Sequence, residues 1–384
     1  MNAPSPRLKV LTVVGTRPEI IRLSAVIKRL DEHVDHVLVH TGQNYDYELN
    51  EVFFEVLGLP RPDHFLEADT SSLGAVLGSI LVKTEQVLLA EKPDAMLILG
   101  DTNSSISAVI AKRMKVPVFH MEAGNRSFDE NVPEETNRRL VDHVADYNLV
   151  YTEHARRNLL AEGLHPSRIR LTGSPMKEVL AQNEHGVAAS TVLADEGLRA
   201  DGYFLVSLHR EENVDFAHRL RDILLGLQAL GVKYDLPVFV STHPRTRKRI
   251  EELDDTFDRL MFHKPLGFHD YLALQNGARL VLSDSGTIAE ESSLMGFPAV
   301  TLRDAIERPE AEDTGAVMLT GTDSGRIVAT AEIAMAQARE TRLMPAPDDY
   351  QIDSVSLRVL TILISTAWSH AERLGLHAGG TTAR

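Results

Sequence analysis

Five short apolar runs of this 384-residue chain each end in a side chain that could take part in acid–base or phosphate chemistry. These side chains are Asp101, Glu122, His209, His243 and Ser285. Apolar runs that alternate with amphipathic segments are typical of parallel sheets buried on both faces. In such sheets ligands bind at the carboxyl ends of the strands. The pattern therefore predicts an α/β enzyme whose site lies at these strand ends.

Three carboxylates are candidates for proton transfer. Asp101 and Glu122 follow consecutive predicted strands, and Glu134 opens the helix after the intervening loop. Parallel pairing would bring them to one sheet edge, where neighbouring acids cannot all ionise freely and can act as acid or base. Each also has a structural alternative. Asp101 could cap a helix, Glu122 could pair with Arg126, and Glu134 could fill a first-turn position that the helix dipole favours.

The segment SDSGTIAEES is the most specific phosphate signal in the chain. A buried strand is predicted to end just before Ser285 and Gly286, which would open the next helix. Free backbone N–H groups and the helix dipole favour an anion there, and Gly286 has no Cβ to block a diphosphate. One turn further, Glu290 or Glu291 could accept hydrogen bonds from ribose hydroxyls. The alternative is an ordinary helix with Asp284 or Ser285 as its N-cap.

Other motifs limit the cofactor. GTRPE puts Arg17 beside a helix start, where it could face the same phosphate, and His209 and His243 could bind phosphate or donate protons. Neither G-x-G-x-x-G nor G-x-x-x-x-G-K-[ST] occurs in the required setting, which argues against nicotinamide cofactors and ATP. The chain has no cysteine and no H-E-x-x-H spacing, so we expect no disulfide, no metal and no cofactor.

The length and the rhythm of the predicted elements indicate two domains. A chain of 384 residues exceeds what one core usually holds, and the strand–helix alternation of its first half continues in its second. We place one Rossmann-like domain at 1–195, a second at 196–353, a long C-terminal helix at 354–376 and a disordered tail at 377–384. The active site is expected in the cleft between the two domains.

Composition limits the partners. The chain is 43% hydrophobic and 25% charged, as in an ordinary soluble protein, and no apolar run approaches the length needed to cross a bilayer. A formal net charge of −15 argues against nucleic acid, which binds a basic face. The N-terminal MNAPSPR lacks the hydrophobic core of a signal peptide. We expect a cytoplasmic enzyme without a membrane or nucleic-acid partner.

The chain also resembles a known family over nearly its whole length, the non-hydrolysing UDP-N-acetylglucosamine 2-epimerases and their relatives that act on other UDP-acetamido sugars. The resemblance implies two Rossmann-like domains of the glycosyltransferase-B type, a homodimer, and a C-terminal helix that crosses back to the first domain. It also implies a cofactor-free reaction, with loss of the C2 proton and anti elimination of UDP to a 2-acetamidoglucal, followed by re-addition. The motifs that carry the resemblance are GTRPEIIRLSAVI, TGQNYD, LGDTNSS, HMEAGNR, PEETNR, LTGSP, HREEN, DSGTIAEES and ERPEA.

The resemblance implies roles for individual residues. Asp101, Glu122 and Glu134 match the catalytic acids of the family, which leaves open which acid removes the proton and which returns it. His209 is counted both with the catalytic groups and with the diphosphate ligands. The implied substrate ligands are Arg17, His209, Ser285 and Gly286 for the diphosphate, Glu291 for the ribose, Tyr271 for the uracil, and His243 and Arg308 elsewhere on the substrate.

Two positions depart from the family pattern. Arg22 stands where the glucosamine enzymes usually have Lys, and Thr287 replaces the second glycine of the usual DSGG. We expect both residues to contact the substrate. At position 22, Arg keeps the charge of Lys but changes the reach and the hydrogen-bond geometry of the side chain. The wording of several motifs is closer to the branch that acts on UDP-2,3-diacetamido uronic acids or UDP-N-acetyl-6-deoxy-L-hexosamines. That branch is one alternative to a UDP-N-acetylglucosamine epimerase for surface polysaccharide precursors, and a glycosyltransferase of the same fold is another.

Overall fold

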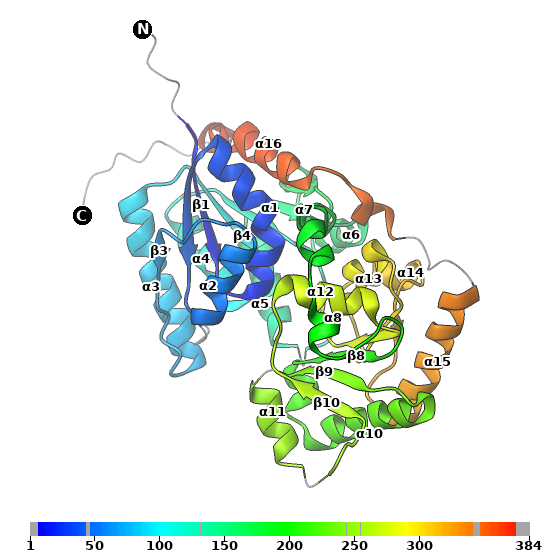
Figure 1. Ribbon diagram of the computed structural model, residues 1–384. Coiled ribbons are helices and arrows are strands. Elements are labelled where there is room, and N and C mark those ends of the chain that lie inside the picture. Colours follow the sequence, from blue (N-terminus) through cyan, green and yellow to red (C-terminus); the bar gives the residue numbers. More distant parts are fainter. Residues whose placement is uncertain are drawn as a thin grey trace. The chain divides into compact units, whose positions relative to one another are not determined.

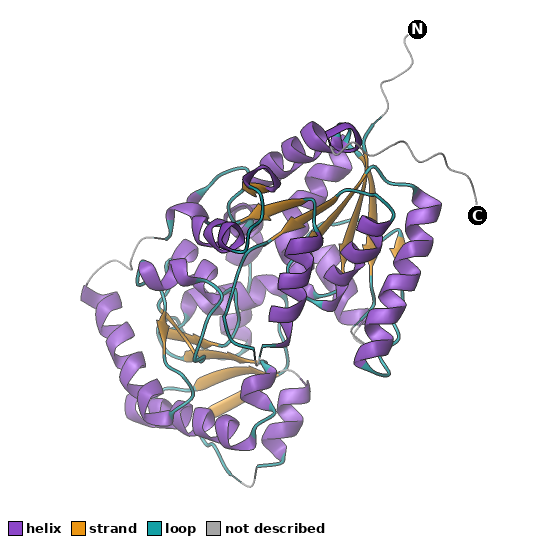
Figure 2. Ribbon diagram, turned by 180° about the vertical axis from the view of Figure 1, so that it is seen from behind, coloured by secondary structure: helices purple, strands orange, loops and turns teal. Residues whose placement is uncertain are grey.

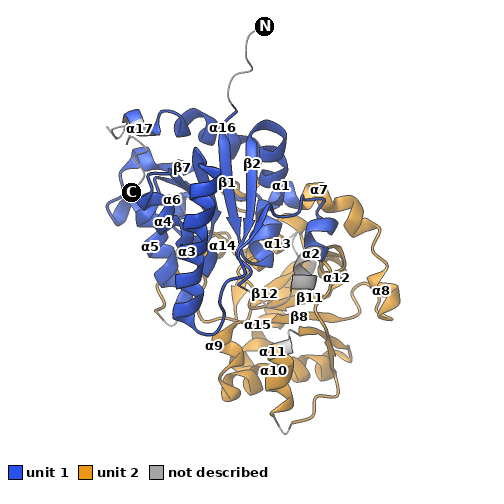
Figure 3. Cartoon of the chain, turned by 90° about the vertical axis from the view of Figure 1, so that its left-hand side faces the viewer, with its two compact units in different colours: residues 1–125, 133–179, 352–384 blue, residues 126–132, 180–351 orange. Residues whose placement is uncertain are grey.

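The chain forms two compact units, which Figure 3 shows in different colours. The computed structural model describes residues 7–43, 47–130, 132–242, 244–253, 255–340 and 346–373. Unit 1 consists of Met1–Asn125, Pro133–Val179 and Ile352–Arg384, and unit 2 consists of Arg126–Val132 and Leu180–Gln351.

Unit 1 is built on a seven-stranded sheet in the order β3-β2-β1-β4-β5-β6-β7, in which all neighbouring strands are parallel. Helices flank the sheet, so strands such as β4 are buried along their whole length (Figure 2). The strands are β1 (Lys9–Val14), β2 (Asp35–His40), β3 (His64–Phe65), β4 (Ala95–Leu99), β5 (Val118–Met121), β6 (Tyr147–Val150) and β7 (Ile169–Leu171). The helices are α1 (Arg17–His33), α2 (Tyr47–Val56), α3 (Leu73–Glu91), η1 (Asn103–Ile106), α4 (Ser107–Arg113), α5 (Pro133–Val144), α6 (Glu153–Ala161), η2 (Pro166–Arg168), α16 (Val355–Ala367) and α17 (His370–Arg373).

Unit 2 repeats this plan with a six-stranded sheet in the order β10-β9-β8-β11-β12-β13, again with parallel neighbours. The strands are β8 (Phe204–Leu208), β9 (Val238–Thr242), β10 (Leu260–His263), β11 (Leu280–Ser283), β12 (Ala299–Thr301) and β13 (Met318–Leu319). The helices are α8 (Val192–Asp195), α9 (Glu211–Val214), α10 (Ala217–Tyr234), α11 (Pro244–Glu251), α12 (Phe268–Gly277), α13 (Ile288–Met295), α14 (Pro309–Asp313), α15 (Ser324–Glu340) and η3 (Asp348–Gln351), and α7 (Met176–Ala188) joins the units.

In both sheets the order in which the chain adds strands reverses at the corresponding place. In unit 1 the chain adds β2 and β3 on one side of β1 and then returns to add β4 on the other side. In unit 2 the chain does the same at β8 and β11. Open parallel sheets bind their ligands in the crevice beyond the strand ends at such a switch point. The loops after β1, β4, β8 and β11 are therefore the places where chemistry is expected.

The predicted α/β fold with two parallel sheets is confirmed. The chain passes from unit 1 to unit 2 within α7, between Val179 and Leu180, whereas the sequence placed the first domain at 1–195. Residues 182–195, which fall in the predicted first domain, lie in α7 and α8 of unit 2, where α8 contacts α12.

The C-terminal segment belongs to unit 1, where α16 lies beside α1 (Figure 1). Glu178 in α7 accepts hydrogen bonds from the backbone N–H and the hydroxyl of Ser356, at 2.9 and 2.6 Å. The helix predicted at 354–376 is shorter, because α16 ends at Ala367 and a turn separates it from α17. The tail predicted at 377–384 lies outside the described residues.

Helix α3 corrects one expectation from the sequence. Among the described residues it is the one helix with the length and mean hydropathy that a membrane span would need, so the prediction that no apolar run is long enough was wrong. Its buried side chains, such as Ile80 and Leu88, line one face that packs against α4 and η1. Leu73, Val82 and Leu89 are exposed. A helix that covers a sheet with one face passes the same test of length and composition.

His40 ends β2 in a buried environment that keeps its ring neutral. The ring stacks on Phe65 with centroids 5.0 Å apart, and Nδ1 accepts the backbone N–H of Gly42 at 3.0 Å. An accepting Nδ1 carries no proton. Burial lowers the pKa of His40 to about 4, which agrees with this arrangement.

We predict that His40→Asn makes the free energy of unfolding less dependent on pH below pH 7. The pKa of His40 is about 4 in the folded chain and about 6.5 in the unfolded chain, which alone takes up a proton between these values. The free energy of unfolding therefore decreases as the pH falls through this window, whereas Asn keeps an acceptor and does not titrate. Between pH 7 and pH 4.5, urea unfolding should show the wild type losing about 2 kcal/mol more than the variant. Equal losses would contradict the assignment.

Candidate active site

A buried carboxylate, Glu19, lies at the switch point of unit 1 and accepts hydrogen bonds from the loops on both sides of it. Its Oε2 accepts the backbone N–H of Gly15 at 2.8 Å and the hydroxyl of Thr16 at 2.9 Å. Its Oε1 accepts the hydroxyl of Thr102 at 3.1 Å and that of Ser104. One side chain thus joins the loop after β1 to the loop after β4.

We describe Glu19 as an ionised hydrogen-bond acceptor whose burial costs free energy. The side chain is 1% exposed, and burial raises the pKa of Glu19 while the donors of Ser104, Thr16, Gly15 and Thr102 oppose this. An ionised carboxylate can accept from all four donors at once. We did not single out Glu19 from the sequence, although TRPE has the T-x-x-E spacing of a capping box, which would have indicated it.

Asp101 follows β4 at this edge of the sheet. Its carboxylate forms an ion pair with Arg138 of α5, and its backbone carbonyl accepts the amide of Asn137 at 3.0 Å. The side chain of Asp101 is 21% exposed, so a ligand can reach it. The short helix η1 is capped by Thr102, whose hydroxyl accepts the backbone N–H of Ser104. The alternative in which Asp101 caps a helix is therefore wrong, because Thr102 has that place.

Glu122 follows β5 and lies beside the residue that precedes Asp101. A Cβ placed on Gly100 would lie 3.3 Å from Oε2 of Glu122, so the loops after β4 and β5 bring the two acids to one place. The carboxylate of Glu122 forms an ion pair with Arg22 of α1. Arg22, which we expected to contact the substrate, is 8% exposed and holds this acid.

Glu134 lies in the first turn of α5 and is half-buried. It precedes Arg138, the partner of Asp101, by four residues, and residues with this spacing share one face of a helix. Asp101 and Glu122 thus lie at one edge of the unit 1 sheet, and Glu134 lies on the face of α5 that carries Arg138, the partner of Asp101.

Asp284 has the corresponding place at the switch point of unit 2. Its buried carboxylate accepts the backbone N–H groups of His209 at 3.1 Å and Arg210 at 2.9 Å, and lies 3.0 Å from Nδ1 of His209. Burial acts to raise the pKa of Asp284, but His209, the N–H of Arg210 and its guanidinium outweigh burial, and the pKa is lowered. Asp284 therefore joins the loops after β8 and β11 and is not the N-cap of α13, a position that Thr287 occupies.

The turn after β11 has the features of an anion site. The backbone N–H of Ser285 donates to Oγ of Ser283 at 3.0 Å, and the hydroxyls of Ser285 and Thr287 lie 2.9 Å apart at the start of α13. A Cβ placed on Gly286 would lie 3.5 Å from Nη2 of Arg210, so this guanidinium lies beside the glycine. We missed Arg210 in the sequence, where its position next to His209 in HREEN was the signal.

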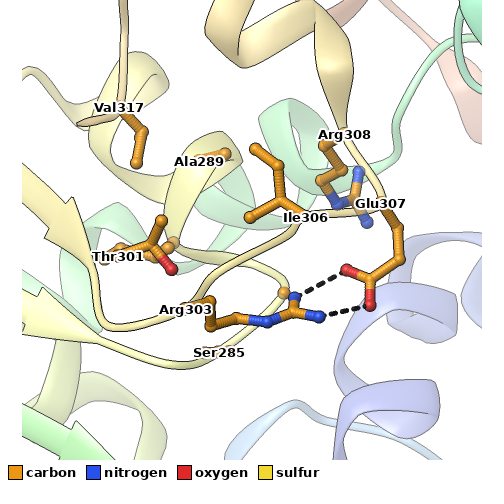
Figure 4. Close-up of a pocket in the computed structure, with 10 residues that line it drawn as sticks. Ser285, Ala289, Thr301, Arg303, Ile306, Glu307, Arg308 and Val317 are labelled. Atoms are coloured by element: carbon orange, nitrogen blue, oxygen red, sulfur yellow. Dashed lines mark hydrogen bonds and ion pairs between the residues drawn. The ribbon is translucent and has the colours of Figure 1, made fainter. Parts of the chain in front are cut away.

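A small pocket in unit 2 opens beside this turn. Figure 4 shows Arg303 and Arg308 at its rim, and Arg303 makes two 2.7 Å hydrogen bonds to Glu307. Arg308 lies 3.1 Å from Glu290 of α13. Guanidinium groups and a helix N-terminus together suit a phosphate group. The lining residues are Ser285, Gly286, Ile288, Ala289, Thr301, Arg303, Ile306, Glu307, Arg308 and Val317.

Tyr271 and Glu291 share a buried network in unit 2. Gln275 on α12, the helix that also carries Tyr271, donates to Oε2 of Glu291 at 2.6 Å. Burial, and then the charge of Glu291, raise the pKa of Tyr271. The contacts of Tyr271 with uracil and of Glu291 with ribose remain predictions.

The remaining predicted residues have different outcomes. The side chain of His209 is 50% exposed, with Nδ1 directed to Asp284. The guanidinium of Arg17 lies 5.6 Å from the ring centroid of Phe53. His243 lies outside the described residues. Within the described part of the chain, no group of three or more His, Asp or Glu side chains is arranged to hold a metal ion.

Comparisons with known proteins identify the family. The family model described as UDP-N-acetylglucosamine 2-epimerase matches residues 28–364. A UDP-N-acetylglucosamine 2-epimerase from Rickettsia bellii is similar in structure, with a TM-score of 0.91, 43% identity and coverage of 97% of this chain and 100% of that one. The Methanocaldococcus jannaschii enzyme in complex with UDP-GlcNAc and UDP has a TM-score of 0.86, 36% identity and coverage of 94% and 100%.

A third relative has a different substrate in its name. The UDP-2,3-diacetamido-2,3-dideoxy-D-glucuronate 2-epimerase of Pseudomonas aeruginosa is 36% identical over 333 residues, which are 85% of this chain and 92% of that protein. The chain therefore belongs to the UDP-N-acetylglucosamine 2-epimerase family, and the family predicted from its motifs is confirmed.

We predict that Glu19→Gln destabilises unit 1. The amide would turn an NH₂ group toward donors that the carboxylate now satisfies, and an unsatisfied buried donor costs about 1 to 3 kcal/mol. Glu32→Gln on the same helix is the matched control, because Glu32 is 60% exposed in a 3.4 Å pair with Arg29. Its effect should stay within about 0.5 kcal/mol. Urea unfolding measures both, and equal effects would refute the bridging role of Glu19.

Proposed function

We propose that the protein is a UDP-2-acetamido-sugar 2-epimerase that inverts C2 by anti elimination of UDP and re-addition through a 2-acetamidoglucal. The single observation that carries this proposal is the convergence of Asp101 and Glu122 at one strand edge, with Glu122 beside Gly100. The anion-binding features around Ser285 in unit 2 support a diphosphate ligand. The Methanocaldococcus jannaschii relative binds UDP-GlcNAc and UDP.

Departure of UDP is the larger chemical demand of this reaction. The C2 proton is not adjacent to a carbonyl, so a base can remove it only as the C1–O bond breaks and its electron pair leaves with UDP. The electrons of the C2–H bond then form the C1–C2 double bond. Groups that stabilise the charge of the departing diphosphate therefore lower the barrier most. We assign this role to His209, Ser285, Gly286 and Arg17, with Thr287 and Arg308 as further substrate ligands.

Proton transfer requires acids on two faces of C2. One carboxylate takes the proton as the C1–O bond to UDP breaks, and a second returns a proton to the opposite face as UDP adds back to C1. We assign these steps to Asp101, Glu122 and Glu134. The ion pairs of Asp101 with Arg138 and of Glu122 with Arg22 orient both carboxylates. Oriented acids and bases of this kind typically contribute about 10² to 10⁴ to the rate.

UDP-N-acetylglucosamine is the first substrate to test, as a precursor of surface polysaccharide. A UDP-2,3-diacetamido uronic acid is the alternative, supported by the Pseudomonas aeruginosa relative and its 36% identity. The pairing of Arg22 with Glu122 supports a role for Arg22 in holding an acid. We therefore propose that residues other than Arg22 determine which UDP-sugar the enzyme accepts.

We predict that the enzyme incorporates deuterium at C2 of its UDP-sugar in heavy water, without any other reactant. Asp101→Asn and Glu122→Gln should each slow this exchange by about 10² or more, because each removes an acid–base group. UDP affinity should stay within a few-fold of the wild type in both variants. Exposed Glu32 on α1 is the matched control, and Glu32→Gln should exchange at the wild-type rate. NMR of a small panel of UDP-acetamido sugars gives the rates and the substrate.

Other outcomes of this experiment would point to other functions. A glycosyltransferase of the same fold would leave C2 unlabelled in the absence of an acceptor. A hydrolysing epimerase would release UDP and a reducing sugar, whereas the proposed enzyme yields intact UDP-sugar epimers. Failure of the whole panel to exchange would refute the proposed function.

We also propose that the enzyme works as a homodimer in which α3 contacts a second copy. The exposed side chains of Val82 and Leu89, seven residues apart on one face of α3, form apolar surface that a partner would cover. We predict that Val82→Asp, which places a charge in this surface, shifts the protein from dimer to monomer in sedimentation velocity runs. Leu225→Asp on α10 is the control, since Leu225 is also exposed but lies in unit 2. A wild-type monomer, or a variant that stays dimeric, would contradict the interface.

A further inference from the structure

A fully buried histidine lies between the loops of the two acids in its contacts, since it bonds to the residue before Asp101 and precedes Glu122 by two residues. His120 is the third residue of β5, and its side chain is 0% exposed. Its Nε2 forms a 2.8 Å hydrogen bond with the backbone carbonyl of Gly100, the residue before Asp101. Its Nδ1 lies 2.9 Å from Oδ1 of Asp142 on α5.

Asp142 in turn holds the turn that carries Glu122. Both of its carboxylate oxygens accept the backbone N–H of Gly124, at 3.2 and 3.1 Å. The carbonyl of Gly124 accepts the amide of Asn158 at 3.0 Å. The His120–Asp142 pair therefore contacts the loop of one acid through Gly100 and the loop of the other through Gly124.

The backbone of these loops depends on glycine at two positions and on contacts that hold Glu122 in an uncommon conformation. Gly100 has φ +70° and Gly124 has φ +81°, and a Cβ on Gly124 would lie 2.4 Å from the carbonyl of Ala155. Glu122 itself has φ +62°, which is uncommon for a residue other than glycine. Strained residues of this kind persist only where surrounding contacts fix them, and they cluster at active sites.

The hydrogen-bonding partners of His120 also limit its protonation. A carbonyl oxygen only accepts, so Nε2 must carry a hydrogen to bond Gly100. A neutral ring would then direct the lone pair of Nδ1 at the Asp142 carboxylate, 2.9 Å away. The contact is an ion-pair contact and not a hydrogen bond. Because both oxygens of Asp142 already accept from Gly124, we place the proton on Nδ1, so that a doubly protonated His120 faces an ionised carboxylate.

We propose that His120 and Asp142 form a buried imidazolium–carboxylate pair that positions Asp101 and Glu122 for proton transfer at C2. Neither residue touches the substrate, so both are positioning residues, and the proposal rests on the proposed function for its kinetic consequence. Removing the pair would let the loops after β4 and β5 relax. A misplacement of about 1 Å at the reacting groups is enough to slow catalysis by about 10²-fold.

Two substitutions of His120 separate positioning from general stability. His120→Gln keeps a donor near the Nε2 position that can bond the Gly100 carbonyl, whereas His120→Met has similar bulk and no donor. We expect His120→Met to lower kcat for C2 deuterium exchange by about 10²-fold with UDP affinity unchanged, and His120→Gln to restore about tenfold of that loss. The exposed neighbour His143 provides the control, and His143→Gln should behave as the wild type.

The same comparison of His120→Gln with His120→Met can also contradict the positioning role. A merely structural role predicts that both variants lose thermal stability while kcat per folded molecule and the ratio of kcat to UDP affinity stay as in the wild type. That result, or equal kcat in His120→Gln and His120→Met, would overturn the positioning role.

The protonation of His120 gives a test that does not depend on activity. Nitrogen-15 NMR of the wild type at pH 7.5, with His120→Gln to assign the signal, should show both ring nitrogens of His120 protonated. A neutral His120 ring would overturn the imidazolium pair even if the kinetic result held. If the wild type does not exchange deuterium with any UDP-sugar while the NMR result holds, the proposed function fails and the buried pair stands.

Discussion

The structure depends on a buried carboxylate at the switch point of each sheet. Glu19 in unit 1 accepts hydrogen bonds from the loops after β1 and β4, and Asp284 in unit 2, which itself lies in the loop after β11, accepts them from the loop after β8. Taking a charge out of water is expensive, so each is tolerated only because several donors converge on it. The donors are backbone N–H groups and short hydroxyls, which fixes the loops that carry Asp101 and Ser285.

Much of the fold and part of the site could be predicted from the sequence. Apolar runs such as AMLILGD predict a buried parallel strand with Asp101 at its end, because sheets of this type leave few polar positions within a strand. Contacts between distant residues could not be predicted in this way. The pairing of Arg22 with Glu122 and of Asp142 with Gly124 depends on which helix packs over which strand end. Only the fold supplies that information.

The supports of the site are more buried than the groups that are assigned to the chemistry. Asp101 is 21% exposed and His209 is 50% exposed, whereas their partners Arg138 and Asp284 are 7% and 0% exposed. A reacting group must meet a ligand, and its accuracy comes from neighbours that are themselves fixed by packing. This division explains why motif reading finds the reacting groups more readily than their supports.

The return of the chain to unit 1 has a consequence for synthesis. Unit 1 is built from both ends of the chain, since α16 packs beside α1 and Ser356 bonds to Glu178, whereas residues 180–351 of unit 2 are continuous. A ribosome delivers the chain from its N-terminus, so unit 2 can complete its core while the first 179 residues still lack the helix that covers α1. The half that carries the acids is therefore finished last, although it is made first.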